Sequence, residues 1–256
     1  MSRLLLPTKS TEEELWIEVI SRAEDIVAGF DCACLAFGDQ THDAIWMAMN
    51  PEWDKTGAEG RSRAAARMVE QWRQTTHDSD GNANTVFLKA TLPGQGGRLV
   101  VGIAIWAQLS MVKGRGDRPS DDLRSTLDLE ALYPGNEAEQ RYLCQVYRSF
   151  VKRRVEVVRE KEGSRLPSVM QLQLCVVDPA YQRMGIASKF VQWGLDEAQR
   201  RGGLEAITEA SGMGRSVYAR LGFHGEGSDI KYDVDDEFLS RDRPANLFMR
   251  TGIIPS

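Results

Sequence analysis

The chain has 256 residues, of which 42% are hydrophobic and 27% are charged, a profile typical of globular proteins with a sizeable core. Its net charge of −5 argues against nucleic acid as a partner, and no apolar run reaches the ~20 residues that span a membrane. We therefore expect a cytoplasmic protein, with a nuclear location as the alternative, and neither a nucleic-acid nor a membrane partner.

The first half of the chain predicts two helices and three strands. Residues 15–20 are rich in large apolar and β-branched side chains and predict a strand, and the apolar spacing over 26–35 predicts a helix. An amphipathic helix is expected within 57–76. Residues 85–90 and 98–106 flank a Gly-rich turn and predict a hairpin whose second strand is apolar enough to be central in a sheet.

A long insertion follows, at about residues 107–167. Its first part, 107–136, is polar and rich in turn residues and predicts an exposed loop. Its second part, 137–161, carries an apolar stripe at helical spacing and predicts a long helix.

The last third alternates between strands and helices. Strands are expected at 170–177 and 204–209, helices at 185–201 and 214–221, and further strands within 223–232 and around 247–250. Early strands and later alternation predict one domain, residues 1–256, of the α/β or α+β class with a mixed sheet.

The four cysteines predict no metal site. Cys32, Cys34, Cys144 and Cys175 lack paired C-x-x-C spacing, and the chain has three histidines to assist them. Structural zinc sites draw on such pairs, so we expect reduced and mostly buried thiols.

A phosphate-binding segment, Gln182-Arg183-Met184-Gly185-Ile186-Ala187, joins a predicted strand to a predicted helix. The first amides of a helix have no internal partner and the helix dipole makes that end positive, so an anion is favoured there. Gly185 and Ala187 let a phosphate approach the main chain closely. Tight packing of the helix on the strand is the alternative explanation for these small residues.

This segment resembles the Q/R-x-x-G-x-G/A motif of the GNAT superfamily of acyl-CoA-dependent N-acetyltransferases. Residues 211–223, which contain Tyr218-Ala219-Arg220-Leu221-Gly222-Phe223, resemble the second element of that signature, at the expected distance. The match covers about 168–225, the predicted CoA-binding core. The resemblance implies an acyltransferase with a mixed, mostly antiparallel sheet flanked by helices, in which the insertion separates the third and fourth strands.

The resemblance also implies which residues hold acetyl-CoA, the expected co-substrate. The main chains of Cys175, Val176 and Val177 would bond the pantetheine arm, and the Val177 amide would contact the thioester carbonyl. Ser211 stands where relatives often have Asn and would touch the same arm. The pyrophosphate would lie on Gln182, Arg183, Met184, Gly185, Ile186, Ala187 and Ser188.

Tyr218 stands where many family members place a tyrosine that protonates the departing CoA thiolate. A phenol with a pKa of about 10 keeps its proton at neutral pH and can donate it. The alternative is a core tyrosine that packs beside Leu221 and Phe223.

The general base is not identified by the sequence. Family members often carry a Glu on the strand before the phosphate loop, but this chain has Gln171 and Gln173 there. The nearest carboxylates are Glu209, our candidate base, and Asp178. Either is also explained as a surface charge, and Asp178 as a turn residue before Pro179.

The predicted function is transfer of the acetyl group of acetyl-CoA to a primary amine of a small molecule, by direct attack in a ternary complex. The alternatives are a catalytically degenerate CoA-binding regulatory protein, a protein or peptide amine as acceptor, and a different acyl group or an oxygen acceptor. We expect a monomer or homodimer. Three uses of the insertion stay open: a lid over the acceptor, a dimer surface, or extra cover for the core.

Overall fold

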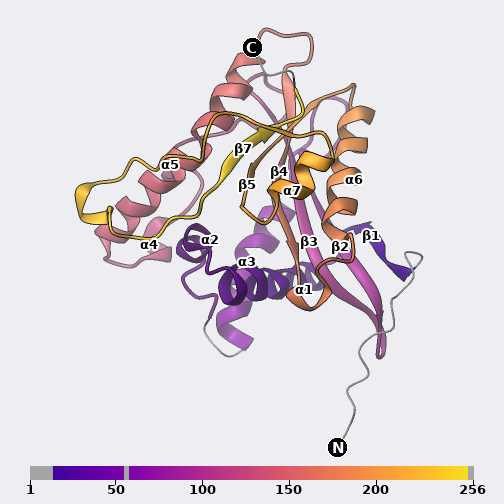
Figure 1. Cartoon of the computed structure of the whole chain (residues 1–256), viewed down its shortest axis with the longest axis horizontal. Helices are drawn as coiled ribbons and strands as arrows, with labels where there is room; N and C mark the ends of the chain where they lie inside the picture. The colour runs from indigo at the N-terminus through magenta and orange to yellow at the C-terminus, as the bar shows by residue number, and fades with distance from the viewer. Residues whose placement is uncertain (1–13, 55–57, 253–256) are drawn as a thin grey trace, which may run out of the picture.

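The computed structural model describes residues 14–54 and 58–252, and their strands form one seven-stranded sheet in the order β1-β2-β3-β4-β5-β7-β6 (Figure 1). Neighbouring strands are antiparallel except β4 and β5, which are parallel. The predicted fold class is confirmed. The strands are β1 (Trp16–Val19), β2 (Thr85–Gly94), β3 (Gly97–Ser110), β4 (Ser168–Val177), β5 (Glu205–Ala210), β6 (His224–Gly225) and β7 (Leu247–Arg250).

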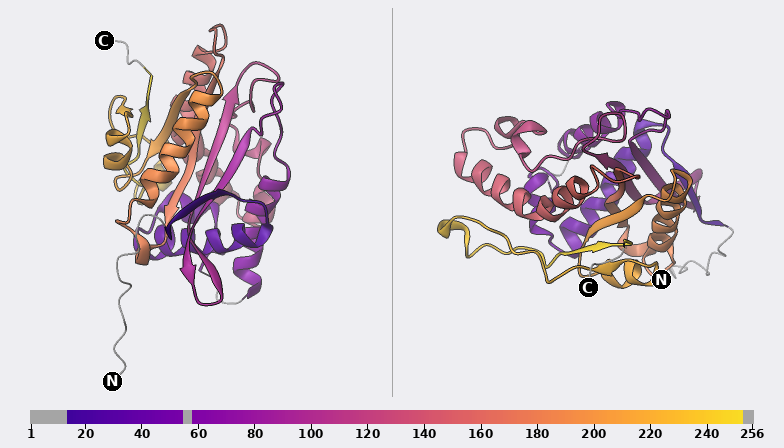
Figure 2. Two further views of the ribbon diagram at one scale, coloured as in Figure 1. Left: turned by 90° about the vertical axis from the view of Figure 1, so that its right-hand side faces the viewer. Right: turned by 90° about the horizontal axis from the view of Figure 1, so that it is seen from above.

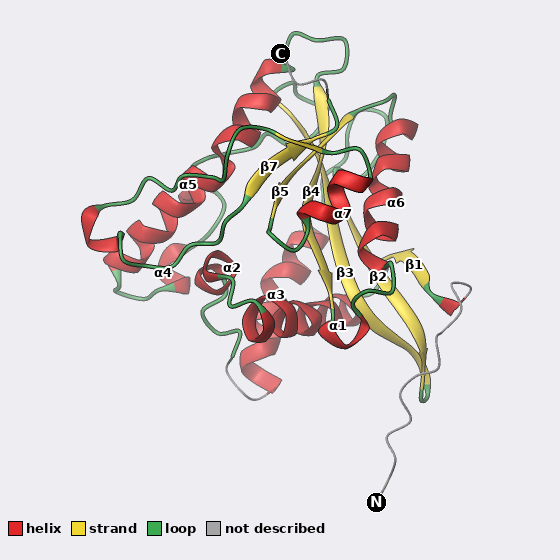
Figure 3. Cartoon of the chain, viewed as in Figure 1, coloured by secondary structure: helices red, strands yellow, loops and turns green. Residues whose placement is uncertain are grey.

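Helices cover both faces of the sheet (Figure 2). One face carries α1 (Ala23–Ala33), which continues into the π-helix η2 (Cys34–Gln40), together with α3 (Ala58–Arg73) and α5 (Glu137–Glu160). The other face carries α6 (Ile186–Arg200), next to α7 (Arg215–Arg220). Figure 3 shows these helices in red around the yellow strands. The shorter helices are α2 (Ala44–Met49), η3 (Leu123–Ser125), α4 (Leu129–Leu132), η4 (Pro179–Tyr181) and η5 (Asp236–Phe238).

Strand β3 is central in the sheet, as its apolar run predicts. Its side chains alternate between the two faces: Ile103 and Ile105 pack with α1, whereas Ala104 and Trp106 pack with α6. The Trp106 indole nitrogen also donates a hydrogen bond to the Phe190 carbonyl of α6, at 3.2 Å. The strand therefore fixes helices on both sides of the sheet.

The prediction of a loop from residue 107 is wrong at its start. Strand β3 continues to Ser110, and residues 107–110 are buried and paired with β4. Gln108 and Ser110 look like loop residues in the sequence, but their polar groups bond inside the fold. The Ser110 hydroxyl donates to the Pro167 carbonyl at 2.6 Å, and the Gln108 amide donates to the Arg115 carbonyl at 2.8 Å.

The remainder of the insertion contributes the long helix α5, close to the range that the sequence predicts. Its Val157 and Val158 are fully buried and pack with Val169, Ile207 and Phe248 of the sheet. The insertion thus covers the core at this face.

The prediction of a strand over 223–232 is mostly wrong, because β6 includes only His224–Gly225. The amides of Glu226 and Ile230 still donate to the carbonyls of Phe248 and Asn246, and the chain then runs along α5 before it returns as β7 (Figure 1). Contacts with α5 replace strand pairing: the Asp233 amide donates to the Ser149 hydroxyl, and Arg141 forms an ion pair with Asp235, each at 3.0 Å.

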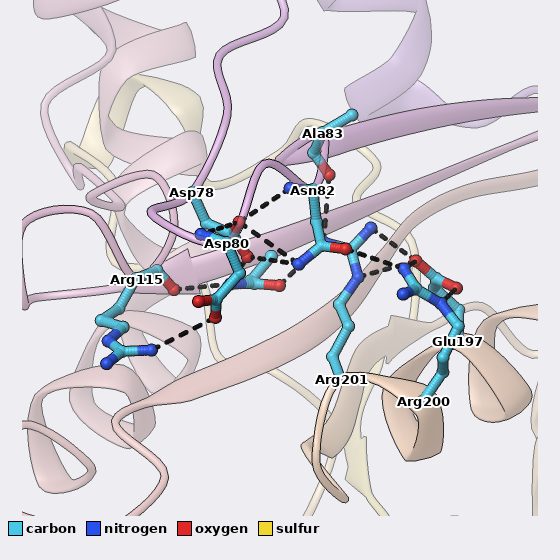
Figure 4. A network of polar contacts seen from close by, with 9 residues as sticks. Asp78, Asp80, Asn82, Ala83, Arg115, Glu197, Arg200 and Arg201 are labelled. Atoms are coloured by element: carbon cyan, nitrogen blue, oxygen red, sulfur yellow. Dashed lines mark hydrogen bonds and ion pairs between the residues drawn. The ribbon is translucent and has the colours of Figure 1, made fainter.

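A polar network ties the start of the insertion to the C-terminal end of α6 (Figure 4). The Asp78 carboxylate accepts hydrogen bonds from the Asn82 amide at 2.8 Å and from the Gln108 side chain at 3.1 Å. Arg201 donates to the other end of Gln108, at 2.7 Å. Because Gln108 of β3 bonds both Asp78 and Arg201, this network fixes the C-terminal end of α6 on the sheet.

Replacing Gly194 with Ala should destabilise the protein. A Cβ atom at Gly194 of α6 would overlap the buried Trp106 ring. Overpacking of this kind costs about 1–3 kcal/mol in the free energy of unfolding. Denaturant unfolding measures it, with Gly163→Ala as control, because a Cβ there meets nothing within 4 Å. Equal stability of the two variants would contradict the close contact.

Candidate functional site

A cleft of about 1130 Å³ opens where β4 and β5 part. The two strands pair only from Val169–Glu205 to Leu172–Thr208, while β7 pairs with the opposite edge of β5, from Ile207 to Ala210. A bulge in β4 at the same place changes its register against β3. The side of β4 that faces β5 is therefore open from Gln173 onward. The cleft is lined by segments within 36–44, 175–177, 181–188, 211–220 and 242–246.

Backbone alternation decides which groups of β4 face this opening. The Asp178 amide donates to the Val101 carbonyl of β3 at 2.9 Å, so the amides two residues apart, at 176 and 178, both point toward β3. The N–H groups of Cys175 and Val177 therefore point into the opening. Of the three residues predicted to bond pantetheine, these two direct their backbone N–H groups into the cleft, whereas the N–H of Val176 points toward β3.

The loop before α6 has the geometry of an anion site. Gly185 caps the helix with φ 79° and no side-chain hydrogen bond, and the first helical bond runs from the Lys189 amide to the Gly185 carbonyl at 3.1 Å. The amides of residues 186–188 precede that bond and point out of the helix end. Arg183 is also left-handed, with φ 67°, a strained conformation for a residue with a side chain.

Gln182 braces this loop with its side chain. Its amide nitrogen donates to the Val177 carbonyl at 3.2 Å and to the Gln40 side chain at 2.8 Å, and Gln40 donates back at 3.1 Å. One side chain thus joins the open strand, the anion loop and the end of η2.

Tyr218 lies on the α7 wall of the cleft and is 7% exposed. Its hydroxyl donates to the sulfur of Cys175, on the open half of β4. Burial and the neighbouring Cys175 raise the pKa of Tyr218 well above 10, so the phenol stays protonated. The ring also packs on Phe223 at 5.9 Å, so Tyr218 is both part of the core and directed at the opening.

The cysteines are protonated thiols where a shift in pKa is resolved. Burial raises the pKa of Cys175 to about 12, although its hydrogen bond with Tyr218 acts in the opposite direction. Burial also raises the pKa of Cys32 to about 12, with smaller contributions from Asp178 and Asp31. A thiolate nucleophile is therefore disfavoured at these positions.

Glu209, the predicted base, is held in an ion pair. Both of its oxygens accept hydrogen bonds from Arg154 of α5, at 2.9 and 2.6 Å, and Gln171 donates to one of them at 3.2 Å. Its role as base stays a prediction. Asp178 accepts a hydrogen bond from the Ala180 amide at 2.8 Å, the turn role that its position before Pro179 suggests.

Ser211 begins the turn that leads into α7. Its carbonyl accepts from the Gly214 amide at 3.0 Å, and it lines the same cleft as Tyr218. Met184 and Met213 stand at the two loops of the cleft and are 38% and 53% exposed. The structure thus brings the predicted donor-site residues to one opening, except Met184, which is not part of the cleft lining.

Sequence reasoning missed the wall opposite α6 and α7. His42, with φ 48°, and Asp43 both line the cleft from the segment between η2 and α2. The Asp43 carboxylate accepts a hydrogen bond from the Trp46 amide at 2.9 Å. In the sequence, an Asp before an apolar segment indicates only a helix cap, so nothing local connects it with Val177 or Tyr218.

Comparison with known proteins agrees with this geometry. Residues 136–223 match the model of the acetyltransferase (GNAT) family. No curated protein sequence matches the chain significantly. Among the described residues, no helix is long and apolar enough to cross a membrane, and no group of three or more His, Cys, Asp or Glu side chains is arranged to hold a metal ion.

Several solved structures share the fold. Arylalkylamine N-acetyltransferase 2 from Aedes aegypti is 16% identical, with a TM-score of 0.57 over 92% of this chain and 97% of that chain. An agmatine N-acetyltransferase is 10% identical, with a TM-score of 0.54 over 93% and 97%. The Drosophila melanogaster polyamine N-acetyltransferase is 10% identical, with a TM-score of 0.53 over 92% and 97%.

Alkylation of Cys175 should be slow and sensitive to acetyl-CoA. Because its pKa is about 12, the thiolate is scarce at pH 8, and the rate with iodoacetamide should rise about tenfold for each pH unit between 8 and 10. Acetyl-CoA should protect Cys175 without changing the labelling of Cys144, which lies outside the cleft lining. Peptide mass spectrometry reads both sites. Equal labelling of Cys175 with and without bound acetyl-CoA would exclude this cleft as the donor site.

Proposed function

We propose that this chain, a member of the GNAT acetyltransferase family and an acyltransferase, transfers the acetyl group of acetyl-CoA to a primary amine of a small molecule. The observation that carries the proposal is the opening beside β4. There, the amides of Cys175 and Val177, the N-terminal end of α6 and the Tyr218 hydroxyl all meet one cleft. We further propose that the whole chain acts as one N-acetyltransferase domain, since a single sheet joins its first and last described strands.

The donor is proposed to lie along the cleft from the anion loop to Tyr218. The outward amides at the start of α6 suit the pyrophosphate, and the absence of a side chain at Gly185 lets it approach the main chain closely. The pantetheine arm suits the open side of β4, where it would add like a further strand. Residues Gln182, Arg183, Met184, Ile186, Ala187, Ser188 and Ser211 complete this assignment.

Transfer is proposed to be direct. The amine nitrogen attacks the thioester carbon, the Val177 amide stabilises the developing oxyanion, and the carbon–sulfur bond breaks. Tyr218 then gives its proton to the leaving thiolate. A covalent acyl-cysteine route is disfavoured because Cys175, the cysteine beside Tyr218, has a pKa of about 12.

A small amine is proposed as acceptor. The cleft lining also carries Asp43 and Asp242, together with Arg243, and carboxylates attract cationic amines. The structural relatives are described as acetyltransferases of arylalkylamines, agmatine and polyamines, which is consistent with this class.

A screen of thiol release from acetyl-CoA tests the function. The acceptors are 2-phenylethylamine, agmatine, spermidine, free amino acids and short peptides. We expect turnover with at least one small primary amine. Tight acetyl-CoA binding without turnover on any acceptor would favour a CoA-binding regulatory protein instead.

Tyr218→Phe should slow the chemical step while leaving donor binding intact. The variant keeps the ring that packs on Phe223 but removes the hydroxyl, so we expect kcat to fall by roughly 10²-fold. The Kd for acetyl-CoA should stay within about twofold, because the loop and strand amides are unchanged. Phe223→Tyr serves as a control for altered packing. An unchanged kcat in Tyr218→Phe, with chemistry rate-limiting, would remove Tyr218 from the mechanism.

A further inference from the structure

Asp43 differs in its surroundings from other carboxylates of the described chain that pair with a cation. Asp25 pairs with Lys89 at 2.9 Å, Glu209 with Arg154 at 2.6 Å, and Glu139 with Arg241 at 2.7 Å. Asp43 instead receives hydrogen bonds from the backbone amides of Trp46 and Ile45, and no ion pair with it is found among the described residues. A negative charge removed from water without a cation is costly, so this position favours a cationic guest.

The region behind Asp43 also has unused hydrogen-bonding capacity. The Tyr232 hydroxyl is buried and has no hydrogen-bond partner among the described residues. Burial raises the pKa of Tyr232, and among the charges that act on it Asp43 contributes most, followed by Glu209. The Tyr232 hydroxyl can therefore accept a hydrogen bond from an N–H donor such as an ammonium group, and Arg243 is the cation that already acts on it.

Asp43 and the proposed reaction centre line the same cleft. Val177 belongs to β4 and Tyr218 to α7, whereas Asp43 precedes α2. Burial raises the pKa of Asp43, and the two backbone hydrogen bonds offset part of that rise. A carboxyl group with a raised pKa is a better proton acceptor than an ordinary one.

We propose that Asp43 binds the ammonium group of the acceptor and takes its proton, an inference that rests on the proposed function. The carboxylate accepts one proton from the ammonium nitrogen. The freed lone pair then forms the new carbon–nitrogen bond. As the carbon–sulfur bond breaks, the thiolate takes the Tyr218 proton, and the second proton of the nitrogen restores Tyr218 as the amide forms. Acceptors are accordingly primary amines that are protonated at neutral pH. Glu209 is neutralised by Arg154, so it shapes the site without accepting the proton.

Asp43→Asn separates this role from the helix cap. Asparagine caps helices as well as aspartate does, so the bond to the Trp46 amide is kept and only the charge and basicity are lost. A matched control is Asp128→Asn. Asp128 caps α4 through a 3.0 Å bond to the Ala131 amide, and it is exposed and outside the cleft lining.

The measurement is steady-state kinetics with the best amine of 2-phenylethylamine, agmatine and spermidine, together with the Kd for acetyl-CoA. We expect Asp43→Asn to lower kcat/KM for the amine by roughly 10²-fold or more, with the acetyl-CoA Kd within about twofold of wild type. Asp128→Asn should equal wild type.

The outcomes distinguish this inference from the proposed function. An active wild type with an equally active Asp43→Asn would overturn the role of Asp43 alone. Equal losses in amine turnover and in acetyl-CoA binding would also overturn it, because they indicate a distorted cleft. A folded wild type that binds acetyl-CoA but acetylates no amine would overturn the proposed function, and the role of Asp43 with it.

Discussion

The divergence of β4 from β5 after Leu172 is the constraint on which the site depends. A strand edge inside a fold leaves backbone donors and acceptors without partners, which is unfavourable unless another chain or ligand supplies them. Here the pairing of β4 with β5 ends at Leu172–Thr208, and a bulge at Gln173 shifts β4 against β3. The amides of Cys175 and Val177 are left facing a cleft, where a ligand can supply the hydrogen-bond acceptors that a neighbouring strand does not.

Side chains on both faces of the sheet hold this opening in place. On one face, Arg154 of α5 binds both oxygens of Glu209 on β5, at the level where the strands part. On the other face, α6 is fixed by its packing on Trp106 and by the network around Gln108. The start of α6 therefore meets the open half of β4 in a fixed geometry. Preorganised amides of this kind bind and polarise a ligand without reorganising.

Much of the donor site could be predicted because its signals are local. The anion loop from Gln182 to Ser188 is one contiguous segment whose small residues let a phosphate approach the main chain. Tyr218 follows in a second short segment. The central strand was evident from its apolar run. The end of β3 was not, since Gln108 and Ser110 are polar residues whose partners lie far away in the chain. The part of the cleft around Asp43 was missed for the same reason, because Asp43 lines the same cleft as Val177 and Tyr218 only in the folded protein.

Amide hydrogen exchange with and without acetyl-CoA tests the central claim most directly, because it reads the backbone groups that the open strand leaves unpaired. Acetyl-CoA should slow exchange at residues 175, 177 and 183–188, while the amides of β2 that pair with β3 stay unchanged. Saturating acetyl-CoA that leaves the amides of 175, 177 and 183–188 unprotected would contradict the assignment of this edge as the donor site.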